Sequence, residues 1–244
     1  MKIKLFTVPN ILTLSNLFCG SVALIEIFLY QNFFAASMLI LASAAFDFLD
    51  GMAARLLGAY SEVGRELDSL ADVVSFGLVP SMFFFTLFNM AEKHIDNPIW
   101  GKWGAVIPLL MVCFSALRLA KFNVDESQKS CFEGLPTPAN ALFCMSLGML
   151  MVSGKITLSG EAIAAISAIM AYLLISPMRF FALKFRSLRW CENRVRYIFL
   201  LLSVAAILFL RDYALPTIVA IYILVSAVSN IIEGVKRAKN NLNE

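Results

Sequence analysis

The sequence has little of what soluble enzymes use to build their sites. Only 15% of its 244 residues are charged, and the single histidine, His94, cannot build a metal site alone. The five cysteines have no CxxC or other paired spacing, which argues against a disulfide framework or a zinc site. No small-x-small cleavage site follows the first apolar run, so we interpret that run as a retained transmembrane helix. No internal repeat is visible, which weakens a transporter interpretation.

Apolar residues are plentiful instead. They make up 60% of the chain, and the mean hydropathy is +0.79. This composition predicts an all-α integral membrane protein, a polytopic bundle in which residues 1–244 form a single membrane domain. A membrane-spanning helix needs about 20 mostly apolar residues. Eight stretches meet this pattern approximately: 10–30, 33–57, 66–90, 104–122, 138–153, 161–181, 195–210 and 213–233.

The basic residues indicate the orientation of these spans. With eight spans, every Lys and Arg except Lys93, Lys102, Lys155 and Arg211 falls on one side of the membrane. The positive-inside rule then places both termini in the cytoplasm. A bacterial-type inner or plasma membrane is the expected location.

Four aspartates interrupt the apolar pattern at the predicted cytoplasmic ends of the second and third spans. On a helix with 100° per residue, Asp47 and Asp50 share one face, and Asp68 and Asp72 share one face of the next helix. Because a short turn joins the two helices, we expect the two acidic faces to meet. A position at the end of a helix would by itself explain the charge of Arg65. It does not explain Asp47 and Asp50, which lie two to three turns inside the span.

Four converging carboxylates cannot all remain ionised without compensation, because desolvation and mutual repulsion favour their neutral forms. Two divalent cations would balance their charge. Carboxylate oxygens are the ligands that Mg²⁺, Mn²⁺ and Ca²⁺ prefer. The sequence therefore predicts a two-metal site of the kind that assists phosphoryl displacement. Small Gly51 and Ala54 would let a ligand approach the helix backbone, or would serve helix packing, and Arg55 suits a phosphate oxygen.

These residues carry a family resemblance. The pattern Asp47-x-x-Asp50-Gly51-x-x-Ala54-Arg55, eight residues, Gly64-x-x-x-Asp68-x-x-x-Asp72 resembles the signature of the CDP-alcohol phosphotransferases at every position. The resemblance implies membrane enzymes, usually dimeric, that displace CMP from a CDP-linked substrate with an alcohol. It also implies that the four aspartates hold two divalent metals and that Asp72 acts as general base on the incoming hydroxyl. Gly64, by the same resemblance, belongs to the nucleotide site.

Further segments resemble the membrane-bound phosphatidylserine synthases of that family. They are "VPNILTLSNLFCG", "SALRLAKFNV" and "FEGLPTPANA", within residues 7–145. The resemblance implies transfer of a phosphatidyl group from CDP-diacylglycerol to L-serine, with membrane lipids and a second copy as partners and no nucleic acid. It places Thr13 and Asn16 near the nucleotide, although interhelical hydrogen bonding explains them equally well.

The acceptor is the most open point. Arg118, Lys121 and Asn123 are candidates for binding the serine carboxylate or a lipid phosphate, whereas topology alone or a helix C-cap would also explain them. Lys121 stands where the related segment usually has Arg, which keeps the charge but removes a bidentate donor. Glycerol 3-phosphate or inositol as acceptor is the close alternative, and a cation transporter is the alternative from another class.

Overall fold

Helices make up nearly all of the described chain. The computed structural model describes residues 5–91, 103–124, 132–181 and 190–241. Its α-helices are α1 Val8–Ile25, α2 Phe33–Leu57, α3 Glu62–Asp72, α4 Val79–Ala91, α6 Leu110–Val124, α7 Thr137–Val152, α8 Gly160–Ile175, α9 Trp190–Leu210 and α10 Ala214–Asn241. A π-helical segment, Val73–Leu78, joins α3 to α4, and a second, Glu26–Tyr30, extends α1. The short strands β1 Phe132–Glu133 and β2 Arg179–Phe180 pair antiparallel. The all-α prediction is confirmed.

Several helices are long and apolar enough to cross a membrane. Within the described residues five runs qualify: Val8–Tyr30, Phe33–Leu57, Glu62–Ala91, Trp103–Val124 and Arg194–Ile232. The helices α7 and α8 are shorter but also apolar. The protein is therefore an integral membrane protein, and the expected count of eight spans stays a prediction.

Several of the expected helix boundaries are wrong, among them the beginning of α9 at Trp190 and the end of α10 at Asn241, and local chemistry explains two others. The third span was expected to begin near residue 66, but α3 begins at Glu62 because the Ser61 hydroxyl accepts the Gly64 N–H at 2.9 Å and caps the helix. The sixth was expected to reach residue 181, but α8 ends at Ile175. Ser176 is extended, as residues that precede a proline tend to be.

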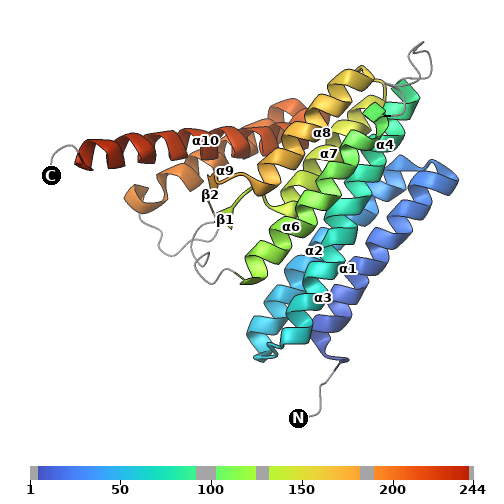
Figure 1. Ribbon diagram of the computed structural model, residues 1–244, viewed down its shortest axis with the longest axis horizontal. Coiled ribbons are helices and arrows are strands. Elements are labelled where there is room, and N and C mark those ends of the chain that lie inside the picture. The colour runs from blue at the N-terminus through green and yellow to red at the C-terminus, as the bar shows by residue number, and fades with distance from the viewer. Residues whose placement is uncertain (1–4, 92–102, 125–131, 182–189, 242–244) are drawn as a thin grey trace.

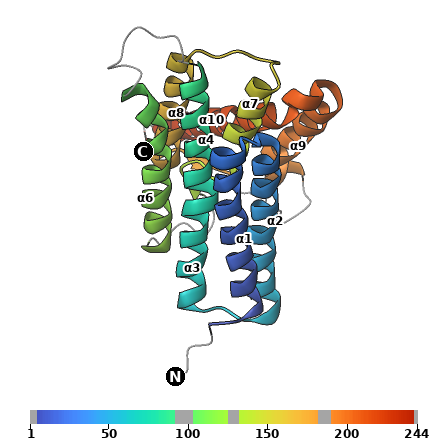
Figure 2. The same cartoon turned by 90° about the vertical axis from the view of Figure 1, so that its right-hand side faces the viewer.

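The first helix is the organising element around the acidic stretch. It packs along both α2 and α3, which lie on either side of it in Figure 2. The axes of the helices from α1 to α8 are roughly aligned with one another. Helix α10 crosses them steeply and packs on α7 and β2 (Figure 1).

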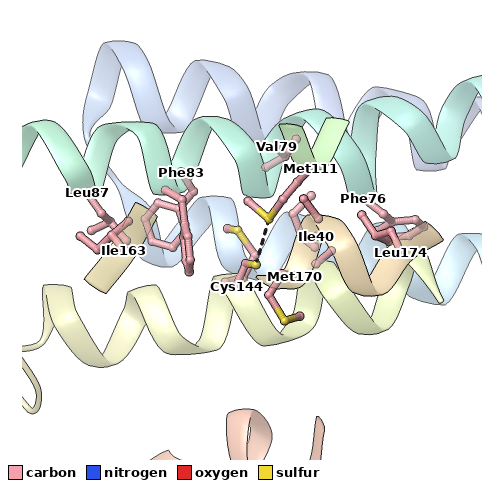
Figure 3. Close-up of a cluster of buried hydrophobic side chains, with 14 of the residues drawn as sticks. Ile40, Phe76, Val79, Phe83, Leu87, Met111, Cys144, Ile163, Met170 and Leu174 are labelled. Carbon is pink, nitrogen blue, oxygen red and sulfur yellow. Dashed lines mark hydrogen bonds between the residues drawn. The ribbon is translucent and has the colours of Figure 1, made fainter. Parts of the chain in front are cut away.

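The apolar core lies among α2, α4, α6, α7 and α8. Figure 3 shows Phe83 and Leu87 of α4 facing Ile163 of α8, with Met111 beside Cys144. The Cys144 thiol donates to the Met111 sulfur at 3.8 Å, and both side chains are fully buried. Cys144 thus acts as a small packing residue, as the unpaired cysteine spacing predicts. The core fixes the far ends of the helices that carry the acidic residues.

Close backbone approach at Gly20 fixes α1 against the segment that follows α3. A Cβ on Gly20 would lie 2.3 Å from the Ser75 hydroxyl and 2.9 Å from the Ser75 Cα. We therefore expect Gly20→Ala to lower the free energy of unfolding by about 1–3 kcal/mol, because the helices must separate. Thermal melting in detergent measures this. The exposed neighbour Ser21 offers a control, since Ser21→Ala should leave the melting temperature unchanged. Equal melting of both variants would contradict the close packing.

Candidate active site

Three carboxylates converge where the sequence predicts it. One oxygen from each of Asp47, Asp50 and Asp68 lies within 4.8 Å of the others. Asp50 is buried, and the other two are half-buried. They come from the C-terminal half of α2 and from α3, and the spacings of three and four residues place them on facing sides.

The fourth aspartate lies beside this group. Asp72 is the last residue of α3, is 7% exposed, and falls outside the set within 4.8 Å. Its carboxylate is still close enough to Asp47 and Asp68 for their charges to interact. Arg118, on α6, is half-buried with its Nε fully buried, and its charge interacts with the Asp72 carboxylate. The Asp72 carboxylate thus interacts with the negative charges of the acidic group and with the positive charge of Arg118.

A polar face of α1 supports both ends of the acidic group. Thr13 donates from its hydroxyl to Asp50 Oδ2 at 2.6 Å, and Asn16 donates from Nδ2 to Asp72 Oδ1 at 3.3 Å. The backbone carbonyl of Asn16 accepts hydrogen bonds from Ser43 at 3.0 Å and from Ser75 at 3.1 Å. The interhelical interpretation of Thr13 and Asn16 therefore holds, and both bonds end on carboxylates of the site.

A cavity of about 740 Å³ opens over the acidic group. Its lining includes most of the residues predicted to bind the nucleotide, and two of the predicted metal ligands, Asp50 and Asp68. The nucleotide residues are Thr13, Gly51, Ala54, Arg55 and Gly64. A Cβ on Gly51 would meet the Arg55 guanidinium at 3.4 Å, so the glycine makes room for that cation next to the backbone. Asn16, Asp47 and Asp72 do not line this cavity.

The predicted acceptor residues lie in and around a second, smaller cavity. Its volume is about 350 Å³, and Arg118 and Lys121 line it. Lys121 forms an ion pair with Glu133 at 2.8 Å. Asn123 lies elsewhere, because its side-chain amide donates to the Ser69 hydroxyl on α3 at 2.9 Å. Phe122 lines both cavities and so forms part of the wall between them.

The acidic group fits a divalent cation. Within the described ranges, no Lys or Arg forms an ion pair with any of its three carboxylates or with Asp72. Asp68 Oδ1 is buried without a hydrogen-bond partner there. Hard carboxylate oxygens at this separation are a donor set that Mg²⁺ or Mn²⁺ prefers. In the part of the chain that the structure describes, the acidic group thus has no ion-pair partner.

Sequence reasoning missed three residues of the site. Asn10 lines the larger cavity and is 2% exposed, and its side-chain Oδ1 would lie 3.0 Å from a Cβ on Gly64. Its spacing of three residues from Thr13, repeated to Asn16, is the signal that could have found it. Phe122 and Glu133 carried no such signal, because their roles depend on contacts between distant elements.

A family model described as CDP-alcohol phosphatidyltransferase matches residues 6–176. Three curated proteins named "CDP-diacylglycerol--serine O-phosphatidyltransferase" are similar to this chain. The Bacillus subtilis protein is 35% identical over 173 residues, which cover 71% of this chain and 89% of its own length. The Helicobacter pylori protein is 31% identical over 228 residues, which cover 90% of this chain and 89% of its own length. The Methanocaldococcus jannaschii protein is 33% identical over 178 residues, which cover 72% of this chain and 75% of its own length.

Proposed function

This chain belongs to the CDP-alcohol phosphatidyltransferase family, and from that premise we propose that it transfers a phosphatidyl group from CDP-diacylglycerol to L-serine. The products are phosphatidylserine and CMP. One observation carries the proposal: an acidic group without an ion-pair partner among the described residues borders a large cavity, and a smaller cavity lined by Arg118 shares Phe122 with it. The names of the similar curated proteins support serine as the acceptor.

The larger cavity is assigned to the CDP moiety. Gly51, Ala54 and Gly64 keep its wall close to the helix backbones, and the exposed Arg55 supplies a cation for a phosphate oxygen. Thr13 holds Asp50 in place from α1, so it acts on the nucleotide site through that carboxylate. The volume of about 740 Å³ lies within the range of small-molecule sites.

The proposed metal ligands are Asp47, Asp50, Asp68 and Asp72, for two divalent cations, Mg²⁺ or Mn²⁺ with Ca²⁺ as a further candidate. When bound, such ions neutralise the pyrophosphate and stabilise the charge that develops on the departing CMP phosphate. The protein supplies the fixed geometry. Helix α1 braces the second aspartate through Thr13 and the fourth through Asn16, so the carboxylates keep their positions near one another despite mutual repulsion.

Asp72 is the proposed general base. The serine hydroxyl oxygen forms a bond to the phosphorus of the phosphatidyl group, and the bond from that phosphorus to the CMP oxygen breaks. The hydroxyl proton passes to a carboxylate oxygen of Asp72. Arg118, near this carboxylate, is the proposed partner of the serine carboxylate, and Lys121 extends the same basic stripe. Asn123 contributes by holding α6 to α3 through Ser69.

Asn16 orients the general base, and its removal gives a test. We expect Asn16→Ala to lower kcat about 10- to 100-fold, the usual effect of losing a residue that orients a ligand or base. The KM for CDP-diacylglycerol should change little, since Asn16 does not line the nucleotide cavity. Ser15→Ala, on the same helix, is the control: among the described residues, its hydroxyl bonds only to the Ile11 carbonyl, at 2.9 Å. A kcat of Asn16→Ala equal to that of the control would contradict this role.

We place both termini, and the active site, on the cytoplasmic side. We assign six spans to α1, α2, α3 with α4, α6, α7 and α8, and two more to the paired helices α9 and α10. Because eight is an even number of spans, both termini then lie on one side of the membrane, the cytoplasmic side, where CDP and serine are available. By family resemblance, the protein acts as a homodimer.

A panel of acceptors tests the proposed function. The purified protein with labelled CDP-diacylglycerol and Mg²⁺ or Mn²⁺ should release CMP with L-serine, and not with glycerol 3-phosphate or inositol. Release with one of those acceptors and none with serine would overturn the acceptor while keeping the reaction class. Uptake of metal ions into proteoliposomes without CDP-diacylglycerol, and no CMP release, would favour a transporter.

A further inference from the structure

Helices α9 and α10 lie beyond the segment that the family model matches, which ends at residue 176. Helix α10 nevertheless packs on β2, the strand that follows the cavity-lining residues at the end of α8 (Figure 1). We propose that Tyr222 of α10 is a positioning residue of the smaller cavity and so sets where the acceptor is held. This inference rests on the proposed function, which places the acceptor at the residues that line this cavity.

Tyr222 is buried among aromatic rings from two other elements. Its ring centroid lies 5.5 Å from that of Phe180 in β2, 4.9 Å from that of Phe181, which follows β2, and 5.7 Å from that of Phe199 on α9. Separations of this size allow favourable tilted and edge-to-face contacts. The Tyr222 hydroxyl donates to the Phe181 backbone carbonyl at 3.0 Å. The ring and the hydroxyl therefore both hold the end of β2.

A second residue on the same face of α10 also holds β2. Asn230 lies eight residues after Tyr222, about two helical turns, so the two side chains project on one side. Its Oδ1 accepts the Arg179 backbone N–H at 3.0 Å, and its Nδ2 donates to the Arg179 carbonyl at 2.7 Å. Its Nδ2 also donates to the Ser226 carbonyl at 2.7 Å, which fixes the amide on its own helix. Helix α10 thus holds β2 at two points.

Strand β2 is joined to the wall of the smaller cavity. Glu133, which lines the cavity, pairs with Arg179 across the two strands. The Gly134 N–H donates to the Met178 carbonyl at 2.9 Å. A Cβ at Gly134 would lie 2.1 Å from the carbonyl oxygen of Leu174, another lining residue, so only glycine allows this approach. The two strands and the end of α8 therefore form one closely packed unit, and a shift of β2 would move the wall.

Tyr222 also acts on the cation that lines the cavity. Arg118 reaches the cavity from α6, and its side chain interacts electrostatically with Tyr222. Because the hydroxyl proton of Tyr222 is used in the bond to Phe181, the phenol oxygen can serve only as an acceptor, which suits a neighbouring cation. Tyr222 thus relates two parts of the lining, the wall next to β2 and Arg118.

The proposed reaction depends on this relation. The acceptor has to contact Arg118 and at the same time bring its hydroxyl to Asp72. Misplacement of a reacting group by about 1 Å can cost 100-fold in rate. A weakened hold on the wall should therefore affect the acceptor first. The described lining of the larger cavity contains no residue of α10, so the nucleotide should bind as before.

Two substitutions on α10 test this role. Tyr222→Phe removes only the hydroxyl and keeps the ring contacts, and it should raise the KM for L-serine about 2- to 12-fold, the usual effect of losing one hydrogen bond. Asn230→Leu removes the amide bonds to β2 with little change in size and should raise this KM as well. The KM for CDP-diacylglycerol should stay at the wild-type value in both variants. CMP release, measured against each substrate at saturation of the other, gives both constants.

Tyr213→Phe is the matched control. The Tyr213 hydroxyl donates to the Lys155 carbonyl at 3.3 Å, just before α10 begins, and Tyr213 lines neither cavity. This control loses the same kind of bond and should keep the wild-type KM for serine. A merely structural role of Tyr222 would lower the amount of active protein without moving that KM. Equal KM values for serine in Tyr222→Phe and Tyr213→Phe would overturn the inference, and a wild-type value in Asn230→Leu would overturn the route through β2.

The wild type separates this inference from the proposed function. If the wild type releases CMP with other acceptors and not with serine, the proposed function fails and this inference with it. If the wild type uses serine and Tyr222→Phe keeps the wild-type KM for serine, only this inference fails.

Discussion

The Asp72→Asn variant should fold and bind CDP-diacylglycerol but release CMP about a hundred- to ten-thousandfold more slowly, the range expected for loss of a general base. The two side chains have nearly the same size, and the asparagine oxygen can still accept the hydrogen bond from Asn16. Only the ability to take the serine proton and to bind a cation changes. A rate measurement at saturating serine and metal gives the comparison.

Asp212→Asn is a matched control for this substitution. Asp212 is exposed and pairs with Lys155, outside both cavities. This variant should react at the wild-type rate. Full metal-dependent CMP release by Asp72→Asn would show that another group accepts the proton.

The second large effect concerns the acidic group. Asp68→Asn should lose about a hundredfold or more in rate, because one charge that holds the cations is gone. In metal-free buffer, however, this variant should be at least as stable as the wild type. Asp68 Oδ1 is buried and unpartnered within the described residues, and two other carboxylates lie within 4.8 Å. Neutralising Asp68 relieves this repulsion, so we expect its melting temperature in EDTA to equal or exceed that of the wild type.

Added metal should reverse that order. At a concentration one hundred times the dissociation constant, a ligand that binds only the folded state stabilises it by about 2.7 kcal/mol. For a chain of this size that corresponds to roughly 5–11 °C in melting temperature. The wild type should show such a rise with Mn²⁺, and Asp68→Asn should show little. Glu66→Gln, an exposed acid on the same helix, should behave as the wild type does. Activity that survives exhaustive EDTA treatment would exclude the metal site.

The acidic group could be predicted from sequence because its information is local. Intervals of three and four residues place Asp47 with Asp50 and Asp68 with Asp72 on helix faces, and a short turn brings the two helices together. The membrane character followed equally directly from composition. The beginning of α3 could have been predicted more accurately, since Ser61 precedes Gly64 by three residues, the spacing of a helix cap.

The rest depends on contacts between distant segments. Asn16 and Asp72 are 56 residues apart in sequence, and Asn123 and Ser69 are 54 apart, so no periodic pattern relates them. Glu133 reaches Lys121 only because β1 pairs with β2 beside the end of α8. The steep crossing of α10 was also beyond prediction, because a helix that is apolar on most sides gives no preferred packing face.

The central claim is that the serine hydroxyl attacks the phosphatidyl phosphorus and displaces CMP. L-serine with a heavy oxygen isotope in its hydroxyl tests this when it is incubated with CDP-diacylglycerol, metal and the purified protein, and the products are analysed by mass spectrometry. We predict that the label appears in phosphatidylserine, in amounts equal to the CMP released, and that the CMP is unlabelled. Labelled product on the cytidine side, or CMP release without labelled phosphatidylserine, would contradict the claim.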